Sequence, residues 1–295
     1  MTMIVARIWG GLGNQMFQYA MGYAISCERN CELRLDTTFY DKEHNERQTK
    51  REFDMFGLPI KIKNIADPVH DVSFLLPILQ TPSVNFIIRK VFPVSFRIGK
   101  FVYVKEDKLQ YLPKVTTINC PNIYYDGYWH SEKYFKKYRK DLLKQFTFTN
   151  ITIENEYKNL CDSFNDAETV AIHIRRGDYI TQNNPNARGV DYYRNAIEKI
   201  KGIIPSCRFC FFSDDLNWVS DNFGDIDNSV LANSNRVLSD LEEFQLMVKC
   251  KHQIISNSSF SWWAAWLNTN QHKVVIVPAV WKNKKDMMLD EWIKI

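Results

Sequence analysis

The sequence lacks the features that mark several large protein classes. It contains no run of about 18 apolar residues, and Gly10 and Gly11 end the first apolar segment before it reaches signal-peptide length. These absences disfavour membrane-spanning and secreted proteins and predict a cytoplasmic one. The excess of positive charge is also small, since 38 Lys and Arg against 34 Asp and Glu give a net charge of +4. Such a charge disfavours a nucleic-acid partner but allows an anionic small molecule.

Metal-binding and hydrolase motifs are weak or missing. The odd number of cysteines, seven, favours a reducing compartment over a disulfide framework. Cys207 and Cys210 lie in an apolar run that predicts a strand, where residues three apart point to opposite faces and cannot share a zinc ion. Asp225 and Asp227 imitate the metal-binding pair of many sugar transferases, but their neighbours favour a solvated loop. The sequence contains no zinc-protease motif, phosphate-binding P-loop or serine elbow, so we predict no metal site.

The length and the hydrophobic pattern predict two α/β domains. A chain of 295 residues exceeds a typical single domain, and 45% hydrophobic with 24% charged residues is typical of a globular protein. Residues 3–36 predict a strand, a glycine turn, a helix over 15–26 and a second strand. The C-terminal half alternates predicted strands with helices, which indicates a doubly wound sheet. The strands are expected at 169–175, 209–213, 252–256 and 273–277, and the helices at 191–200, 239–249 and 260–267.

The segment 86–105 combines basic and apolar residues. No acidic residue occurs from Val72 to Lys105, while lysines and arginines alternate with aromatic and branched side chains. One interpretation is contact with an anionic membrane surface, which would place the protein peripherally at the inner membrane face. The favoured interpretation is a pair of core helices whose lysines extend into solvent.

A glycine loop follows the first predicted strand. In Gly10-Gly11-Leu-Gly13-Asn14-Gln15, backbone amides at a helix N-terminus can approach an anion. With Asp36 after the next strand, the loop resembles the dinucleotide fingerprint, although Met16 replaces its third glycine. This supports an alternative function, an NAD(P)- or FAD-dependent oxidoreductase; the plain alternative is a tight turn.

Two further segments place polar groups at predicted strand ends. His173 and Arg175 share one strand face, and a guanidinium there can hold a phosphate through two parallel hydrogen bonds. An ion pair between Arg175 and Asp178 is the structural alternative. The serine-rich turn from Ser256 to Phe260 offers hydroxyls and helix N-terminal amides to a diphosphate, or merely caps a helix.

Five blocks in order resemble the alpha-1,2-fucosyltransferase family, also called glycosyltransferase family eleven. The blocks run from Gly10 to Tyr19, from Gly127 to Phe135, from His173 to Tyr179, from Phe212 to Asp215 and from Ser256 to Trp263. The resemblance implies a GT-B-like fold, in which two Rossmann-like domains face each other across a cleft. We expect an acceptor-side domain over residues 1–149 and a GDP-fucose-binding domain over residues 150–295.

The resemblance also implies the reaction. It is the inverting, metal-independent transfer of L-fucose from GDP-fucose to the 2-hydroxyl of a β-galactoside, in a glycan such as a lipid-linked surface polysaccharide unit. No cofactor is implied beyond the donor. A non-catalytic glycan-binding protein is disfavoured, because it would need neither Arg175 nor the serine turn.

Carried onto this sequence, the resemblance predicts three groups of site residues. The catalytic group consists of Arg175 as the leaving-group clamp, Asn14 as the group that orients the attacking hydroxyl, and Asp178 as a candidate base. The donor-binding group consists of His173, Arg176, Asp214, Ser256, Asn257, Ser258, Ser259 and Phe260. The residues expected at the acceptor or cleft are Gly11, Gly13, Gln15 and Asp36, of which Asp36 is a second candidate base.

Overall fold

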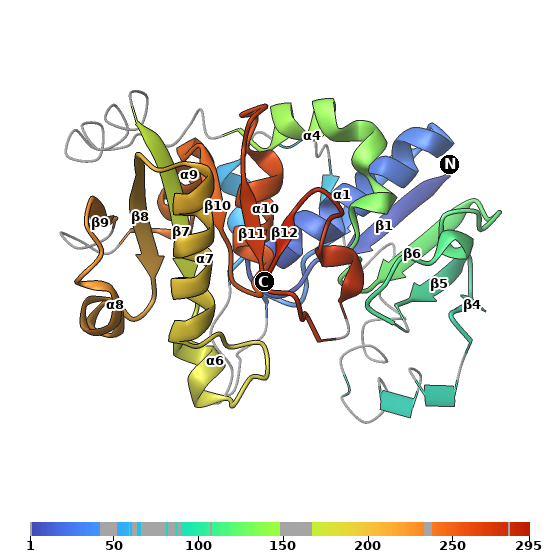
Figure 1. The fold of residues 1–295 in the computed structure, drawn as a ribbon. Helices are drawn as coiled ribbons and strands as arrows, with labels where there is room; N and C mark the ends of the chain where they lie inside the picture. Colours follow the sequence, from blue (N-terminus) through green and yellow to red (C-terminus); the bar gives the residue numbers. More distant parts are fainter. Residues whose placement is uncertain are drawn as a thin grey trace. The chain divides into compact units, whose positions relative to one another are not determined.

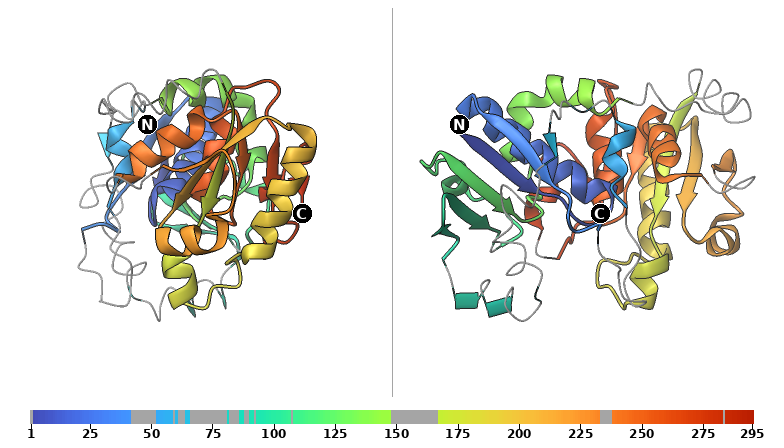
Figure 2. Two further views of the ribbon diagram at one scale, coloured as in Figure 1. Left: turned by 60° about the vertical axis from the view of Figure 1, so that its left-hand side comes forward. Right: turned by 180° about the vertical axis from the view of Figure 1, so that it is seen from behind.

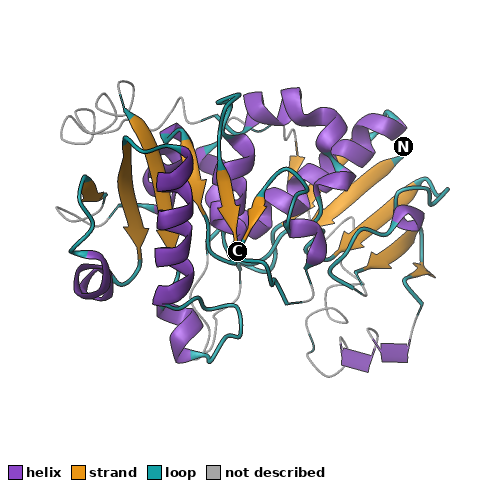
Figure 3. Ribbon diagram, viewed as in Figure 1, coloured by secondary structure: helices purple, strands orange, loops and turns teal. Residues whose placement is uncertain are grey.

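The structure is a computed structural model, and it divides into two compact units, Met1–Gln145 and Phe146–Ile295. The sequence predicts this boundary between residues 149 and 150. Each unit contains a six-stranded sheet flanked by helices over the described residues (Figures 1 and 3). The described residues are 2–41, 52–58, 60, 64–65, 81, 86–87, 90–91, 93–106, 108–147, 167–232, 238–282 and 284–295.

The first unit contains a sheet with strand order β3-β2-β1-β6-β5-β4. Its neighbouring strands are parallel except for β4 and β5. The strands are β1 (Met3–Arg7), β2 (Glu32–Asp36), β3 (Asn64–Ile65), β4 (Ser95–Ile98), β5 (Phe101–Lys105) and β6 (Asn122–Asp126). The helices are α1 (Leu12–Arg29) and α4 (Arg139–Gln145), with 3-10 turns η1 (Asp54–Gly57), η3 (Pro113–Val115), η4 (Glu132–Tyr134) and η5 (Lys136–Tyr138).

The predicted β-α-β start of the chain is confirmed. β1 and β2 pair in parallel, with Arg7 opposite Asp36, and α1 packs against both strands. The helix ends at Asn30, whose left-handed backbone (φ 49°) lets its N–H bond the carbonyls of Cys27 and Ser26. The connection places the glycine turn and the start of α1 at the carboxyl ends of β1 and β2, where open α/β sheets bind ligands.

The segment 86–105 differs from the favoured interpretation of two core helices. Residues 95–98 and 101–105 form the antiparallel pair β4 and β5. Phe96 and Ile98 alternate with polar residues, and Phe101 to Val104 is a short continuous run of aromatic and β-branched residues, and both patterns are typical of strands. Before them, Phe86, Ile87 and Val91 are 66%, 52% and 71% exposed. Residues 88, 89 and 92 lie outside the described part of the chain.

The second unit contains a parallel sheet with strand order β12-β11-β10-β7-β8-β9. Every strand and helix predicted for this half is present. The strands are β7 (Glu168–Ile174), β8 (Cys207–Ser213), β9 (Ser229–Leu231), β10 (His252–Ile254), β11 (Val275–Val277) and β12 (Ile293–Lys294). The helices are α6 (Gly177–Thr181), α7 (Val190–Ile203), α8 (Leu216–Phe223), α9 (Asp240–Lys249) and α10 (Ser259–Leu267), with the 3-10 turn η6 (Lys285–Met287).

Helices cover both faces of this second sheet (Figure 2). On one face, Ile172 and Ile174 of β7 join a core with Tyr193 and Ile197 of α7. On the other face, α9 and α10 pack together. None of the helices in the described part of the chain combines the length and apolar character that crossing a membrane requires.

Candidate functional site

Polar side chains gather at the carboxyl edge of the second sheet. β7 lies between β8 and β10, and Ile174 at the end of β7 is opposite Ser213 at the end of β8. Arg175 and Asp214 therefore leave adjacent strands side by side, and Ser256 follows the end of β10 two residues later. This is the edge at which parallel sheets bind ligands.

Arg175 is held by two carboxylates. Its Nε and Nη2 donate to Asp178 Oδ1 at 2.9 and 2.8 Å, and its Nη1 lies 3.2 Å from Asp214 Oδ2. Burial alone would lower the pKa of Arg175, but Asp214 and Asp178 outweigh it and raise the pKa. The ion pair with Asp178 is therefore present, yet it engages only part of the guanidinium. A second N–H on each terminal nitrogen has no partner among the described residues, so the guanidinium keeps donors that suit phosphate oxygens.

The Arg176 guanidinium interacts with residues at the start of α8. Its backbone N–H donates to Asp214 Oδ1 at 2.8 Å, which fixes the second oxygen of that carboxylate. Its guanidinium lies 4.0 Å from the Trp218 ring centroid and donates to Asp215 Oδ2 at 3.0 Å, an interaction that lowers the pKa of Asp215. Asp215 also caps α8 by accepting from the Trp218 N–H. The Arg176 side chain thus joins the end of β7 to the start of α8.

His173 is a buried neutral imidazole. It is 4% exposed, and its Nδ1 lies 2.8 Å from Ser256 Oγ. Burial, aided by the positive charge of Arg175, lowers the pKa of His173 to about 3. The ring also packs beside Phe260, with centroids 5.7 Å apart. At neutral pH this group can donate or accept a hydrogen bond but carries no charge.

The serine turn carries an unsatisfied polar atom. Ser258 caps α10 by accepting from the Phe260 N–H. Asn257 is 2% exposed, donates to the Val280 carbonyl at 3.0 Å, and accepts from the Tyr179 hydroxyl at its own carbonyl. Its Oδ1 has no hydrogen-bond partner among the described residues. Because an unmade buried hydrogen bond costs about 1–3 kcal/mol, this oxygen is suited to a ligand N–H or O–H.

Glu243 of α9 is a candidate site residue that the sequence pattern did not single out. Burial, together with the nearby carboxylates of Asp240 and Asp214 and against the opposing charge of Arg175, raises the pKa of Glu243 to about 7. A carboxylate that senses both Arg175 and Asp214 lies close to this edge of the sheet. The sequence feature that could have indicated this residue is its position beside Phe244, on the apolar side of a predicted helix.

In the first unit, polar side chains at the start of α1 make hydrogen bonds around the glycine loop. Gly11 is the N-cap of α1 and makes no side-chain cap bond. Gln15 is fully buried and donates to the carbonyls of Gly10 at 3.0 Å and Glu52 at 2.8 Å. Asn14 Oδ1 lies 3.0 Å from His130 Nε2. Gln15 therefore maintains the turn, whereas Asn14 interacts with the loop after β6.

The Asp36 carboxylate accepts hydrogen bonds from groups of its own unit. It is 1% exposed, accepts from the Thr38 N–H at 3.0 Å and the Thr38 hydroxyl at 2.6 Å, and binds the Tyr124 hydroxyl through its other oxygen. Both oxygens are thus engaged inside the unit. This geometry suits a residue that orders the loop after β2 better than one that accepts a proton from a substrate.

The comparisons with known proteins decide the family. Residues 3–295 match the model described as Glycosyl transferase family 11. The chain belongs to this family. It is 32% identical over 315 residues to an alpha-1,2-colitosyltransferase of Escherichia coli, covering 100% of this chain and 99% of that protein. It is 30% identical over 307 residues to the O-antigen biosynthesis glycosyltransferase WbnK of Escherichia coli, covering 97% and 98%.

A solved structure agrees with the GT-B-like fold of this family 11 glycosyltransferase. A mutant of FUT1 from Arabidopsis thaliana in complex with GDP superimposes with a TM-score of 0.51 at 13% identity, covering 96% of this chain and 71% of that one. At this identity the likeness concerns the fold alone. It supports the GT-B-like α/β fold that the resemblance implied.

Membership of a glycosyltransferase family does not support the oxidoreductase alternative. A dinucleotide fingerprint also needs an acidic residue that is available to a ribose hydroxyl, and Asp36 is occupied by Thr38 and Tyr124. The fingerprint in this family 11 chain is therefore a tight turn that starts α1.

The residues of the two weak metal motifs lie in separate parts of the second unit of this family 11 chain. Asp225 pairs with Arg194 at 2.9 Å on the surface. Cys207 and Cys210 are buried free thiols of β8. Within the described residues, no group of three or more His, Cys, Asp and Glu side chains is arranged to hold a metal ion.

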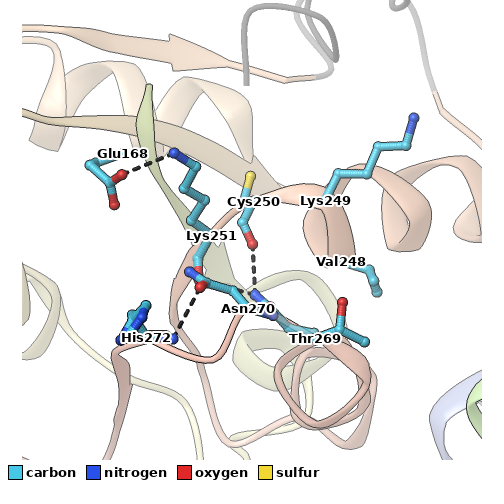
Figure 4. A pocket seen from close by; sticks show the side chains of 9 residues that line it. Glu168, Val248, Lys249, Cys250, Lys251, Thr269, Asn270 and His272 are labelled. Atoms are coloured by element: carbon cyan, nitrogen blue, oxygen red, sulfur yellow. Dashed lines mark hydrogen bonds and ion pairs between the residues drawn. The ribbon is translucent and has the colours of Figure 1, made fainter. Parts of the chain in front are cut away.

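A pocket of about 650 Å3 lies at the opposite edge of the second sheet (Figure 4). Glu168, at the start of β7, pairs there with Lys251 at 2.9 Å and with His252 at 2.8 Å. The Glu168 carboxylate is thus already paired, and the amino ends of parallel strands are not where α/β sheets bind ligands. The carboxyl edge therefore stays the candidate site of this glycosyltransferase.

Proposed function

We propose that the protein is an inverting, metal-independent alpha-1,2-fucosyltransferase. It moves L-fucose from GDP-fucose to the 2-hydroxyl of a terminal β-galactoside in a lipid-linked repeat unit of a surface polysaccharide. The observation that carries the proposal is Arg175, which Asp178 and Asp214 hold while an N–H on each terminal nitrogen has no partner among the described residues. Membership of family 11 supports the reaction class, and the relative named for O-antigen biosynthesis supports the acceptor class.

Arg175 supplies the cation that stabilises the departing diphosphate. As the sugar–oxygen bond breaks, negative charge grows on the β-phosphate, and a fixed guanidinium stabilises this charge without having to reorganise. Asp178 and Asp214 act through Arg175, because they hold its plane. We therefore assign Asp178 a positioning role in preference to that of general base.

The remaining donor contacts follow from the chemistry of GDP. The serine turn, including Ser258 and Ser259 at the start of α10, offers hydroxyls and amides to the diphosphate. Asn257 Oδ1 accepts a hydrogen bond from the donor. Glu243 binds guanine, because the adjacent N1–H and N2–H groups of that base match the two oxygens of a carboxylate. His173 lies beside Ser256 as a neutral donor or acceptor.

The acceptor belongs to the first unit in this proposal. Asn14 at the start of α1 orients the hydroxyl that attacks the anomeric carbon, from the side opposite GDP, so that the configuration inverts. Gly11 and Gly13 keep the loop close to the acceptor, and Gln15 and Asp36 keep it folded. Exposed Phe86, Ile87 and Val91, with Lys90 Nζ 5.8 Å from the Phe86 ring centroid, support membrane contact at the start of the segment 86–105.

GDP-colitose is the second candidate donor, because a relative at 32% identity is named a colitosyltransferase. Colitose is fucose without its 3-hydroxyl, so one hydroxyl separates the two hypotheses. The test supplies each nucleotide sugar in turn to the purified protein with lacto-N-biose and N-acetyllactosamine. GDP release is followed, and the product linkage is determined by NMR.

An α-1,2-linked fucosyl product supports the proposal. A turnover with GDP-colitose more than about tenfold above that with GDP-fucose replaces fucose by colitose as the donor sugar. Transfer from neither sugar, or formation of another linkage, contradicts the proposed function.

A further inference from the structure

The loop after β6 holds one buried histidine against the glycine loop. His130 is 1% exposed, and its Nε2 lies 3.0 Å from Oδ1 of Asn14, the third residue of α1. The two residues are 116 positions apart in the sequence. This contact connects the family block that begins at Gly10 with the block that begins at Gly127.

The backbone of this loop adopts a conformation that needs support. Trp129 has a positive φ of 59°, which is costly for a residue with a side chain. The Glu106 carboxylate stabilises it by accepting the N–H groups of Tyr128 at 2.7 Å and Trp129 at 3.0 Å. A Cβ on Gly127 would lie 2.4 Å from Glu106 Cβ, so only glycine fits there. These contacts support the loop conformation that directs His130 inward.

Two rings fix the plane of the imidazole. The Tyr128 ring stacks on it at 4.9 Å with an interplanar angle of 6°. The Phe17 ring meets it edge-on at 4.9 Å. With its plane set, His130 presents Nε2 to Asn14 in a single direction.

The contact selects one orientation of the Asn14 amide. Oδ1 is an acceptor, so Nε2 of His130 must carry the proton and donate. A rotated amide would place its NH2 group against this N–H and lose the bond. The NH2 group is instead directed away from His130, and its nitrogen lies 2.8 Å from the position that a Cβ on Gly10 would occupy. The amide donors of Asn14 therefore border the glycine turn.

We propose that His130 is a positioning residue for acceptor transfer: it fixes the amide of Asn14 so that the NH2 group faces the acceptor hydroxyl. This inference rests on the role proposed above for Asn14. His130 does not touch the substrate, and its effect on the reaction passes through Asn14.

The matched variants are His130→Gln and His130→Asn. The amide nitrogen of Gln is as many bonds from Cβ as Nε2 of histidine, whereas that of Asn is one bond short and corresponds to Nδ1. We expect His130→Gln to keep the kcat/KM for the acceptor within about threefold, and His130→Asn to lose about tenfold, in line with one hydrogen bond. The affinity for GDP should not change in either variant. Equal losses in both variants would overturn the inference.

A double-mutant cycle separates positioning from general damage. If His130 acts through Asn14, the double variant Asn14→Ala, His130→Asn loses no more kcat/KM than Asn14→Ala alone. Losses that multiply would overturn the inference. If the wild-type enzyme transfers sugar and Asn14→Ala has no effect, the proposed role of Asn14 has failed instead.

A spectroscopic readout requires neither activity nor a folded variant. In the 15N NMR spectrum of the wild-type protein, the imidazole of His130 should carry a proton on Nε2. A neutral ring protonated only at Nδ1 cannot donate to Asn14 and would overturn the inference, whether or not the protein transfers fucose.

Discussion

Replacing Arg175 by alanine should abolish most of the transfer while leaving the protein folded. The variant removes the fork that we assign to the β-phosphate, and removal of one such group typically costs about 3–4 kcal/mol of transition-state stabilisation. At about 1.4 kcal/mol per tenfold change in rate, kcat should fall by a few hundredfold.

The structure predicts only a small loss of stability. Arg175 is about a quarter exposed, and partly exposed ion pairs contribute about 0–1 kcal/mol. Asp214 keeps the hydrogen bond from the Arg176 N–H at 2.8 Å, and the Asp178 side chain is 21% exposed, so neither carboxylate is left isolated in an apolar interior. The Tm should fall by no more than a few degrees.

The assay is steady-state GDP release with saturating acceptor, together with thermal unfolding of each variant. Arg194→Ala is the matched control, because it removes another arginine–carboxylate pair of the same unit, with Asp225. Arg175→Lys keeps the charge but not the planar fork, and should lie between Arg175→Ala and the wild type. The assignment is wrong if folded Arg175→Ala keeps turnover within about threefold, or if Arg194→Ala falls as far.

Three further predictions follow from charge and exposure. GDP binding should weaken as the pH falls through about 7, because Glu243 must be ionised to accept two N–H groups. Calorimetry should find no such pH dependence in Glu243→Gln. The same pH dependence of GDP affinity in this variant would refute guanine binding by Glu243. His173 has a folded pKa of about 3, below its unfolded value near 6.5. Its contribution to the free energy of unfolding, on the order of a few kcal/mol, should therefore be lost as the pH falls from about 6.5 towards 3. Urea unfolding at pH 7 and 5 should reveal a larger loss of unfolding free energy in the wild type than in His173→Gln. Equal losses in the two proteins would contradict the burial argument. Finally, the protein should float with anionic vesicles at low salt and less so as Lys90→Glu; no flotation of the wild type would remove the membrane contact.

The sequence predicted the second sheet well, because its signals are local. The capping box of Ser239 and Glu242 is present at the start of α9, and the β-branched run before Arg175 forms β7. Elements too short to show a period were missed, among them the two-residue strand β12 and the five-residue helix α6.

The candidate site was only partly predictable. The rule that strand ends share an edge brought Arg175, Asp214 and Ser256 together without a structure. The directions of individual side chains depend on distant partners that no local pattern encodes. Asp36 is occupied by Tyr124, which is 88 residues away, and the Arg176 guanidinium turns towards Trp218.

The most direct test of the central claim is a calorimetric titration of the purified protein with GDP in excess EDTA, with UDP and NAD as controls. The account predicts binding of GDP without added metal, weaker or no binding of UDP, and none of NAD. Binding of NAD with no response to GDP would contradict the donor site at Arg175 and would indicate a dinucleotide site at the glycine loop.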